Sequence, residues 1–103
     1  MNKIKQTTEF KQWFKTVKDP IAKIAMTKRI ERAMIGNFGD YKSLGGGLYE
    51  MRINTGKGYR IYYAQHGEII YILLNGGDKS KQQADIEKAK VILADIKTGK
   101  IIK

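Results

Sequence analysis

The stretch YRIYYAQHGEIIYILL, residues 59–74, decides the fold because it is typical of two strands joined by a tight turn. Its first half is rich in tyrosine and isoleucine, which favour strands. His66-Gly67 is predicted to be a two-residue hairpin turn. The run 68–74 is apolar on both faces and stops at Asn75, as in a strand that is covered on both sides. The segment therefore predicts an antiparallel hairpin whose second strand is central in a sheet.

The predicted turn also fixes which side chains share a face, because a two-residue turn pairs Gln65 with Glu68. In that register Tyr62 lies opposite Tyr71, and Arg60 shares their face. An arginine and two tyrosines are costly to bury without partners, so we expect this face to be an open groove. The core side chains of the hairpin are then Ile61, Tyr63, Ile70, Ile72 and Leu74.

Toward the N-terminus, a helix is predicted after a candidate edge strand at residues 3–6. Its apolar side chains recur at helical spacing, at Phe10, Trp13, Phe14 and Val17. Thr7 or Thr8 is the expected N-cap. The helix is expected to stop near Lys18, since Pro20 follows.

A second helix is predicted directly after the first. Asp19 is its expected N-cap, and Pro20 suits the first helical position. Gly36-Asn37 is expected to end it. Its buried face is predicted to carry Ala22, Ala25, Met26, Ile30, Ala33 and Met34. Because the connection is so short, we expect the two helices to form an antiparallel pair.

Further elements flank the hairpin. Residues 41–44 are a candidate short strand, and residues 48–54 alternate as a half-buried strand does. Ser80 and Gln83 fit a capping box at the start of a last helix. The apolar stripe of that helix is Ile86, Ala89, Leu93 and Ile96. The expected fold is α+β, with two N-terminal helices packed on a curled antiparallel sheet of three to four strands, and a C-terminal helix.

The composition bounds the kind of protein. A chain of 103 residues suits one domain, residues 1–103. Its 20 lysines and arginines exceed its 10 aspartates and glutamates, giving a net charge of +10 that favours polyanionic partners such as RNA, DNA, the ribosome or an acidic protein. There is no cysteine for disulfides. We see no apolar leader and no membrane-length apolar run, so we expect a cytoplasmic protein that has no membrane partner.

Cationic side chains from three segments are expected to meet beyond the hairpin. They are Arg52, Lys57, Arg60, Lys79 and Lys81. Guanidinium and ammonium groups beside aromatic rings suit a phosphodiester with unstacked bases. Two alternatives stay open, because lysines at a polar turn are often only solvated and Arg60 is equally suited to an ion pair, for instance with Glu50.

The chain offers no familiar catalytic constellation. It has no Ser-His-Asp set, no histidine-paired nucleophile and no carboxylate cluster. Its one histidine, His66, falls in the predicted turn and has no second histidine or cysteine for a metal site. We therefore expect no metal and no cofactor, and any cleavage chemistry would use Lys, Arg and Tyr side chains.

Three motifs together carry a family resemblance. They are GNFGDYKSLGGGLYEMRIN at residues 36–54, GYRIYY at residues 58–63 and LLNGGDKSKQQADIEKAK at residues 73–90. The chain resembles the RelE/ParE superfamily of toxins, and most of all the HigB-like phage-related addiction-module killer proteins. The resemblance runs over nearly the whole chain and implies a RelE-like fold.

The resemblance implies a toxin of a type II toxin–antitoxin module. Its partner would be a co-encoded antitoxin, usually of helix-turn-helix type, in a hetero-oligomeric complex. RelE-like members cut mRNA in the ribosomal A site, so ribosome and mRNA are the expected targets and metal-independent endoribonuclease the expected activity. ParE-like members inhibit DNA gyrase without cutting RNA, which is the first alternative. A phage accessory protein that binds nucleic acid is the second.

The resemblance also implies roles for single residues. Arg60 matches the RelE arginine that contacts the scissile phosphate, and Arg52 matches a lysine of the catalytic strand. Lys79 matches a further arginine, so the charge is kept while the bidentate geometry is lost. We expect Lys81 to complete this phosphate site. Glu50 departs from the pattern, because RelE has a second lysine there.

The tyrosine that RelE carries near the start of its last helix has no counterpart here. This chain has Ala84, Asp85 and Ile86 in that region. The residues expected to contact RNA beside the phosphate site are Lys57, Tyr62, Tyr71 and Gln82.

Overall fold

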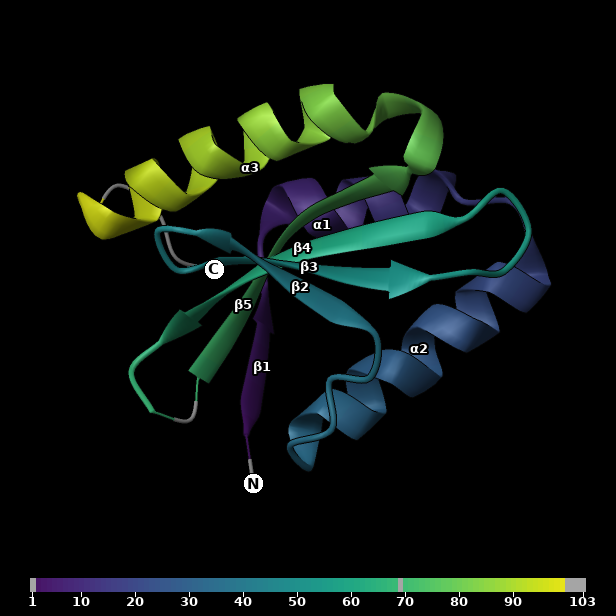
Figure 1. The fold of residues 1–103 in the computed structure, drawn as a ribbon, viewed down its shortest axis with the longest axis horizontal. Helices are drawn as coiled ribbons and strands as arrows, with labels where there is room; N and C mark the ends of the chain where they lie inside the picture. The colour runs from purple at the N-terminus through teal and green to yellow at the C-terminus, as the bar shows by residue number, and fades with distance from the viewer. Residues whose placement is uncertain (1, 69, 100–103) are drawn as a thin grey trace.

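The computed structural model describes residues 2–68 and 70–99 of the chain. Within this part, three helices surround one sheet (Figure 1). The elements are β1 (Lys3–Gln6), α1 (Thr8–Thr16), α2 (Pro20–Met34), β2 (Tyr41–Gly45), β3 (Leu48–Ile53), β4 (Tyr59–His66), β5 (Ile70–Asp78), a 3₁₀ turn (Lys79–Lys81) and α3 (Gln82–Lys97). None of these helices is long and apolar enough to span a bilayer.

The sheet has five strands in the order β1-β5-β4-β3-β2. β1 runs parallel to β5, and every other neighbouring pair is antiparallel. The α+β class was predicted correctly, but three to four antiparallel strands was wrong, because the sheet is mixed and has five. β5 is apolar on both faces and needs a hydrogen-bonding partner on each side. β1, the candidate edge strand at residues 3–6, pairs with β5 on the side opposite β4.

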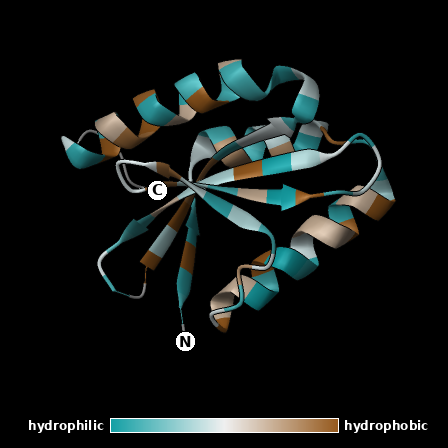
Figure 2. Ribbon diagram, in the orientation of Figure 1, coloured by the Kyte–Doolittle hydropathy of each residue, from teal (hydrophilic) through white to brown (hydrophobic). Residues whose placement is uncertain are grey.

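The helices cover both faces of the sheet. α1 and α2 lie on one face and α3 lies on the other (Figure 1). Along α2 and α3, hydrophobic residues are interspersed with hydrophilic ones, as expected for helices with one buried side (Figure 2). The expected antiparallel pairing of α1 with α2 is not a main contact of either helix, since α1 packs chiefly on β5 and α2 on β1 and β3.

Local signals placed the first two helix starts correctly. The Thr7 side chain accepts a hydrogen bond from the backbone N–H of Phe10 at 3.0 Å, and the carboxylate of Asp19 accepts from the N–H groups of Ile21 and Ala22. The predicted buried face of α2 is correct apart from Met34, whose side chain is exposed near the end of the helix.

The hairpin register differs from the prediction. His66 pairs with Ile70, so the connection holds three residues instead of two. The register then shifts between Tyr62 and Tyr63, and Tyr62 pairs with Asn75. Tyr62 therefore lies under α3, whereas Tyr71 lies on the opposite face with the α1 and α2 cluster. The expected open groove holding both tyrosines beside Arg60 does not exist.

β5 does not stop at Asn75, because the strand continues through two glycines to Asp78. A Cβ atom on Gly76 would lie 2.3 Å from the Trp13 ring, and one on Gly77 would lie 1.9 Å from the Asp85 carboxylate. The two glycines therefore extend the strand and let α1 and α3 approach it from opposite sides.

The start of the last helix also differs from the prediction. Ser80 does not act as a cap. Instead, the Asp78 carboxylate accepts a hydrogen bond from the Ser80 N–H at 2.9 Å and also contacts its hydroxyl. That arrangement forms the 3₁₀ turn, and α3 begins at Gln82 without a capping side chain. The predicted stripe of α3 is buried at Ala89, Leu93 and Ile96.

Candidate nucleic-acid interface

Arg52 and Arg60 face each other on neighbouring strands and share one carboxylate. They are directly opposed in the β3–β4 ladder. The Arg52 Nε donates to Glu50 Oε1 at 3.1 Å, and the Arg60 Nε lies 4.0 Å from Glu50 Oε2. Glu50 is fully buried. A buried carboxylate requires paired partners, so the ion pair of Arg60 with Glu50, left open by the sequence, is part of this structure.

The two guanidinium groups differ in how far they reach solvent. The Arg52 side chain is 34% exposed and the Arg60 side chain only 13%. The Arg60 Nε is buried without a hydrogen bond, because its 4.0 Å separation from Glu50 is a charge contact only. An anion arriving from solvent would therefore meet Arg52 first, with Arg60 behind it.

Gln82 of α3 also contacts the Glu50 carboxylate. Its side-chain amide, on the first residue of α3, donates to Glu50 Oε2 at 2.6 Å. Gln82 was expected to contact RNA, but in this structure its amide is engaged with Glu50. The sequence offered Glu50 as a partner of Arg60, but it did not predict the hydrogen bonds of Glu50 with Arg52 and Gln82.

Tyr62 is not available to a ligand. Its side chain is fully buried beneath α3. Burial, followed by the charges of Glu50 and Asp85, raises the pKa of the Tyr62 phenol far above its ordinary value. The phenol therefore stays protonated at neutral pH and cannot accept a proton. The prediction that Tyr62 contacts RNA is incompatible with this burial.

Lys79 directly follows β5, the strand that pairs with the Arg60 strand. Its backbone N–H donates to the carbonyl of Gly58 at 2.9 Å, and its aliphatic chain packs over that glycine. Gly58 directly precedes β4, and Arg60 pairs with Gly77 of β5, so Lys79 follows the strand beside Arg60. Its residue is exposed, so the ammonium group is accessible.

Lys57 and Lys81 line a separate cleft of about 560 Å³ beside Trp13. This cleft includes neither Arg52 nor Arg60 in its lining. It also contains Asp78, whose pKa is lowered first by hydrogen bonds from Ser80 and then by these two lysines. The structure brings the two lysines together, as expected, but apart from the arginines.

The same cleft carries compensating charges. Its lining includes Lys18 and Lys88 as well as Glu9, Asp19 and Asp85. Burial raises the pKa of the Asp85 carboxyl, and Lys88 and Lys81 partly oppose that shift. Lysines and carboxylates are therefore balanced here, and the cleft is a weaker anion site than the arginine pair with Lys79.

Tyr71 lies away from all these cations. Its half-buried ring contacts Phe38, with 4.7 Å between ring centroids, on the face covered by α2. Among the described residues, no group of three or more histidine, cysteine, aspartate or glutamate side chains is placed to hold a metal ion.

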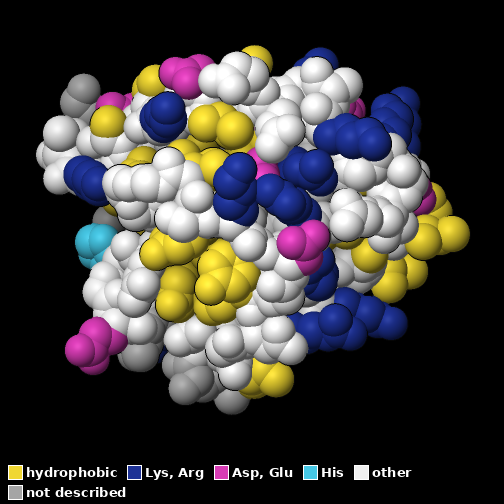
Figure 3. Space-filling model, in the orientation of Figure 1, with side chains coloured by type: hydrophobic (Ala, Val, Ile, Leu, Met, Phe, Trp, Pro, Cys, Tyr) yellow, Lys and Arg dark blue, Asp and Glu magenta, His cyan; other side chains and the backbone are white. Residues whose placement is uncertain are grey.

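The space-filling view shows how charged and hydrophobic side chains are distributed on one face of the molecule (Figure 3). Figure 3 shows a group of Lys and Arg side chains on the face where β2 lies in front, with a hydrophobic patch beside it. Two kinds of chemistry that suit a nucleic acid, cationic and apolar, therefore share one face of this protein.

Comparison with known proteins gives two matches. The sequence profile of a family described as "Phage derived protein Gp49-like (DUF891)" matches residues 9–97. A curated protein of Haemophilus influenzae, described as "Uncharacterized protein", is 43% identical over 93 residues, which cover 90% of this chain and 94% of the relative. The profile match runs from α1 to the last turn of α3 and includes every predicted site residue.

Proposed function

Because this chain belongs to the Gp49-like family of phage-derived proteins, we propose that it is the toxin of a type II toxin–antitoxin module and that it cuts mRNA on the ribosome. The observation that carries this proposal is the pair Arg52 and Arg60 on adjacent strands, held by one buried carboxylate and flanked by the exposed Lys79. The motif resemblance to RelE-like toxins points to the same residues.

This arrangement suits a phosphodiester in several ways. Glu50 holds the Arg52 guanidinium by a hydrogen bond and attracts that of Arg60 before any ligand arrives, so less side-chain entropy is lost on binding. Glu50 uses the Nε of Arg52, and the terminal nitrogens of a guanidinium are suited to paired phosphate oxygens. Three cations against one carboxylate leave a positive surplus for the phosphate.

The proposed reaction is a transesterification within the RNA. The 2′-oxygen forms a bond to the adjacent phosphorus and loses its proton, while the bond from phosphorus to the 5′-oxygen breaks. The departing oxygen gains a proton, so the products are a 2′,3′-cyclic phosphate and a 5′-hydroxyl. Arg52, Arg60 and Lys79 would stabilise the negative charge that develops on the phosphoryl oxygens.

The proposed partners follow from the same surface. A cognate antitoxin, expected to be of helix-turn-helix type, would cover the cations or distort the strands that hold them, through acidic or apolar contacts. Ribosome binding would be electrostatic and would weaken as salt increases. Affinity for ribosomes that is equal at low and high salt would contradict the proposed electrostatic contact.

The test is induction of wild type, Arg60→Ala, Arg60→Lys and Lys79→Ala in cells, with mRNA 5′ ends mapped across the transcriptome. Loss of Arg60 should reduce cleavage by on the order of 100-fold, as for removal of one preorganised donor. Arg60→Lys should restore only part of it. Lys28→Ala, an exposed change on α2, is the matched control and should cleave normally.

The outcomes separate the candidate functions. A folded Arg60→Ala protein that cleaves mRNA like wild type would remove Arg60 from the site. Growth arrest by wild type with intact mRNA would favour the gyrase-inhibiting alternative. Neither arrest nor cleavage, together with retained RNA binding, would favour an accessory nucleic-acid-binding protein. Thermal melts of each variant distinguish loss of function from loss of fold.

A further inference from the structure

A cluster of aromatic rings lies on the sheet face opposite α3, toward the β2 edge. The Tyr63 ring is stacked between Phe38 and Tyr49, with centroid distances of 5.2 and 5.4 Å and interplanar angles of 8° and 20°. Tyr41 contacts both outer members of this stack at tilted angles, 6.1 Å from Phe38 and 6.3 Å from Tyr49. The cluster therefore extends from the core to the last strand of the sheet.

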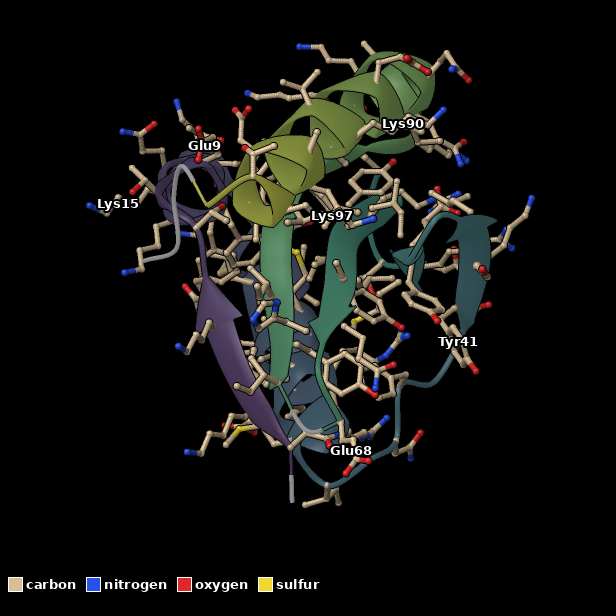
Figure 4. The ribbon with its side chains drawn as sticks, turned by 90° about the vertical axis from the view of Figure 1, so that its left-hand side faces the viewer. Glu9, Lys15, Tyr41, Glu68, Lys90 and Lys97 are labelled. Atoms are coloured by element: carbon tan, nitrogen blue, oxygen red, sulfur yellow. The ribbon has the colours of Figure 1, made fainter. Side chains whose placement is uncertain are left out.

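The cluster is only partly covered. Tyr63 is buried and Tyr49 is half-buried, whereas Tyr41 is 52% exposed. β2 is the outermost strand on its side, and Figure 4 shows Tyr41 at that outer edge. A large aromatic side chain that stays half exposed while fixed by two neighbouring rings is suited to receive another flat ring.

The segment that carries these rings is held rigidly. The Arg29 guanidinium donates to the carbonyls of Phe38 and Asp40, at 3.0 Å each, and also to the carbonyl of Arg52. The Arg52 backbone N–H in turn donates to the Asp40 carbonyl at 2.9 Å. Tyr41 follows Asp40 directly, so its backbone is positioned before any ligand binds, which lowers the entropic cost of binding.

Cations lie next to the exposed ring, on the other face of the same edge strand. Lys42 follows Tyr41 and pairs with Glu50, so its side chain shares a face with Glu50 and Arg52. Figure 3 shows Lys and Arg side chains adjoining the hydrophobic patch on this side of the molecule. At an edge strand both faces are accessible, so one ligand can contact rings and cations together.

We propose that the β2 edge is a stacking platform for bases of single-stranded RNA, formed by Tyr41 with Tyr49 behind it, and that Lys42 and Arg52 hold the flanking phosphates. Single strands fit because only unstacked bases offer a free face to an aromatic ring. This inference rests on the proposed function, since it names how the substrate strand would lie beside the arginine pair.

The test measures binding of two fluorescent RNA ten-mers to the purified protein, one an oligo(A) and one of equal length and charge whose bases are absent. Wild type should prefer the oligo(A) by about 5- to 150-fold, the range expected for stacking of one base on an aromatic ring. Tyr41→Leu should abolish this preference, and Tyr41→Phe should keep it because the ring remains. Val91→Ala, an exposed apolar change on α3, is the matched control and should behave as wild type.

Salt dependence separates the phosphate contact from the stacking. Lys42→Ala should reduce the slope of log affinity against log salt by about one unit while keeping the preference for bases. Equal binding of both ten-mers by wild type would overturn the proposed stacking platform. The same result is expected if the patch around Tyr41 binds a protein partner instead of RNA. If wild type still cleaves mRNA in cells, that result leaves the proposed function standing. Failure of wild type to cleave, with the base preference intact, would reject the proposed function alone.

Discussion

The two faces of the sheet bury different kinds of side chain, although both faces are formed by the same strands. The face under α1 and α2 is apolar and aromatic, with Met26, Met51 and Ile61 among its most buried members. The face under α3 buries Leu48, Ile72 and Leu74, and it also encloses the polar side chains of Glu50 and Asn75. The first face is built from apolar and aromatic contacts, whereas the second also positions charged groups for a ligand.

The difference has an energetic consequence. Apolar burial stabilises in proportion to the area removed from water, and no partner has to be matched. A buried polar group stabilises little and costs free energy when it loses its partner. Among the described residues, polar atoms of Arg60, Asn75 and Asp85 are buried without a hydrogen bond on the α3 face, and the Nε of Arg29 is so on the other face. We therefore expect mutations on the two faces to affect stability and function in different proportions.

The largest effect on stability should come from the apolar face. Ile61→Ala removes a fully buried side chain and should lower the free energy of unfolding by about 2–5 kcal/mol. The measurement is urea denaturation followed by circular dichroism. Ile24→Ala is the control, since Ile24 is 57% exposed and its truncation should change stability by less than about 0.5 kcal/mol. Equal effects of the two changes would remove the distinction between core and surface.

A smaller effect is expected from the polar face. Glu50→Gln keeps the shape but removes the charge that Arg52 and Arg60 share, so it should cost about 1–3 kcal/mol of unfolding free energy. The cost is moderated because the Arg52 side chain is partly exposed. The double variant Glu50→Gln with Arg52→Gln should be more stable than the sum of the two single changes predicts. If the effects of the two single changes add up to that of the double variant, the contact between Glu50 and Arg52 contributes nothing to stability.

The smallest expected effect is a pH dependence at the start of α3. Burial raises the pKa of Asp85, so its protonated form is favoured in the folded state. The stability that the protonated Asp85 gives the folded state is fully present below the ordinary pKa of an aspartate. It is lost as the pH rises through the raised pKa of the folded state. Asp85→Asn does not ionise, so its melting temperature relative to wild type should be higher at pH 7 than at pH 3. A difference that is the same at both pH values would contradict the raised pKa.

Much of the fold was predictable because its signals are local. Thr7 and Asp19 cap helices through hydrogen bonds to residues two or three positions along the chain, and Pro20 has no N–H to lose. The strand positions followed from their apolar patterns. Of the five cations expected to meet, Arg52 and Arg60 lie opposite each other, whereas Lys57 and Lys81 line a different cleft.

The sequence by itself determined the order of the elements, the N-caps of the first two helices and the cationic surplus, because each depends on composition or on near neighbours. Only the tertiary structure decided which side chains share a face. The longer hairpin connection, in which His66 pairs with Ile70, separated Tyr62 from Tyr71, because side chains alternate with a period of two. The tertiary structure also decided why residues 76 and 77 are glycines, since the space that they leave is filled by Trp13 of α1 on one side and Asp85 of α3 on the other.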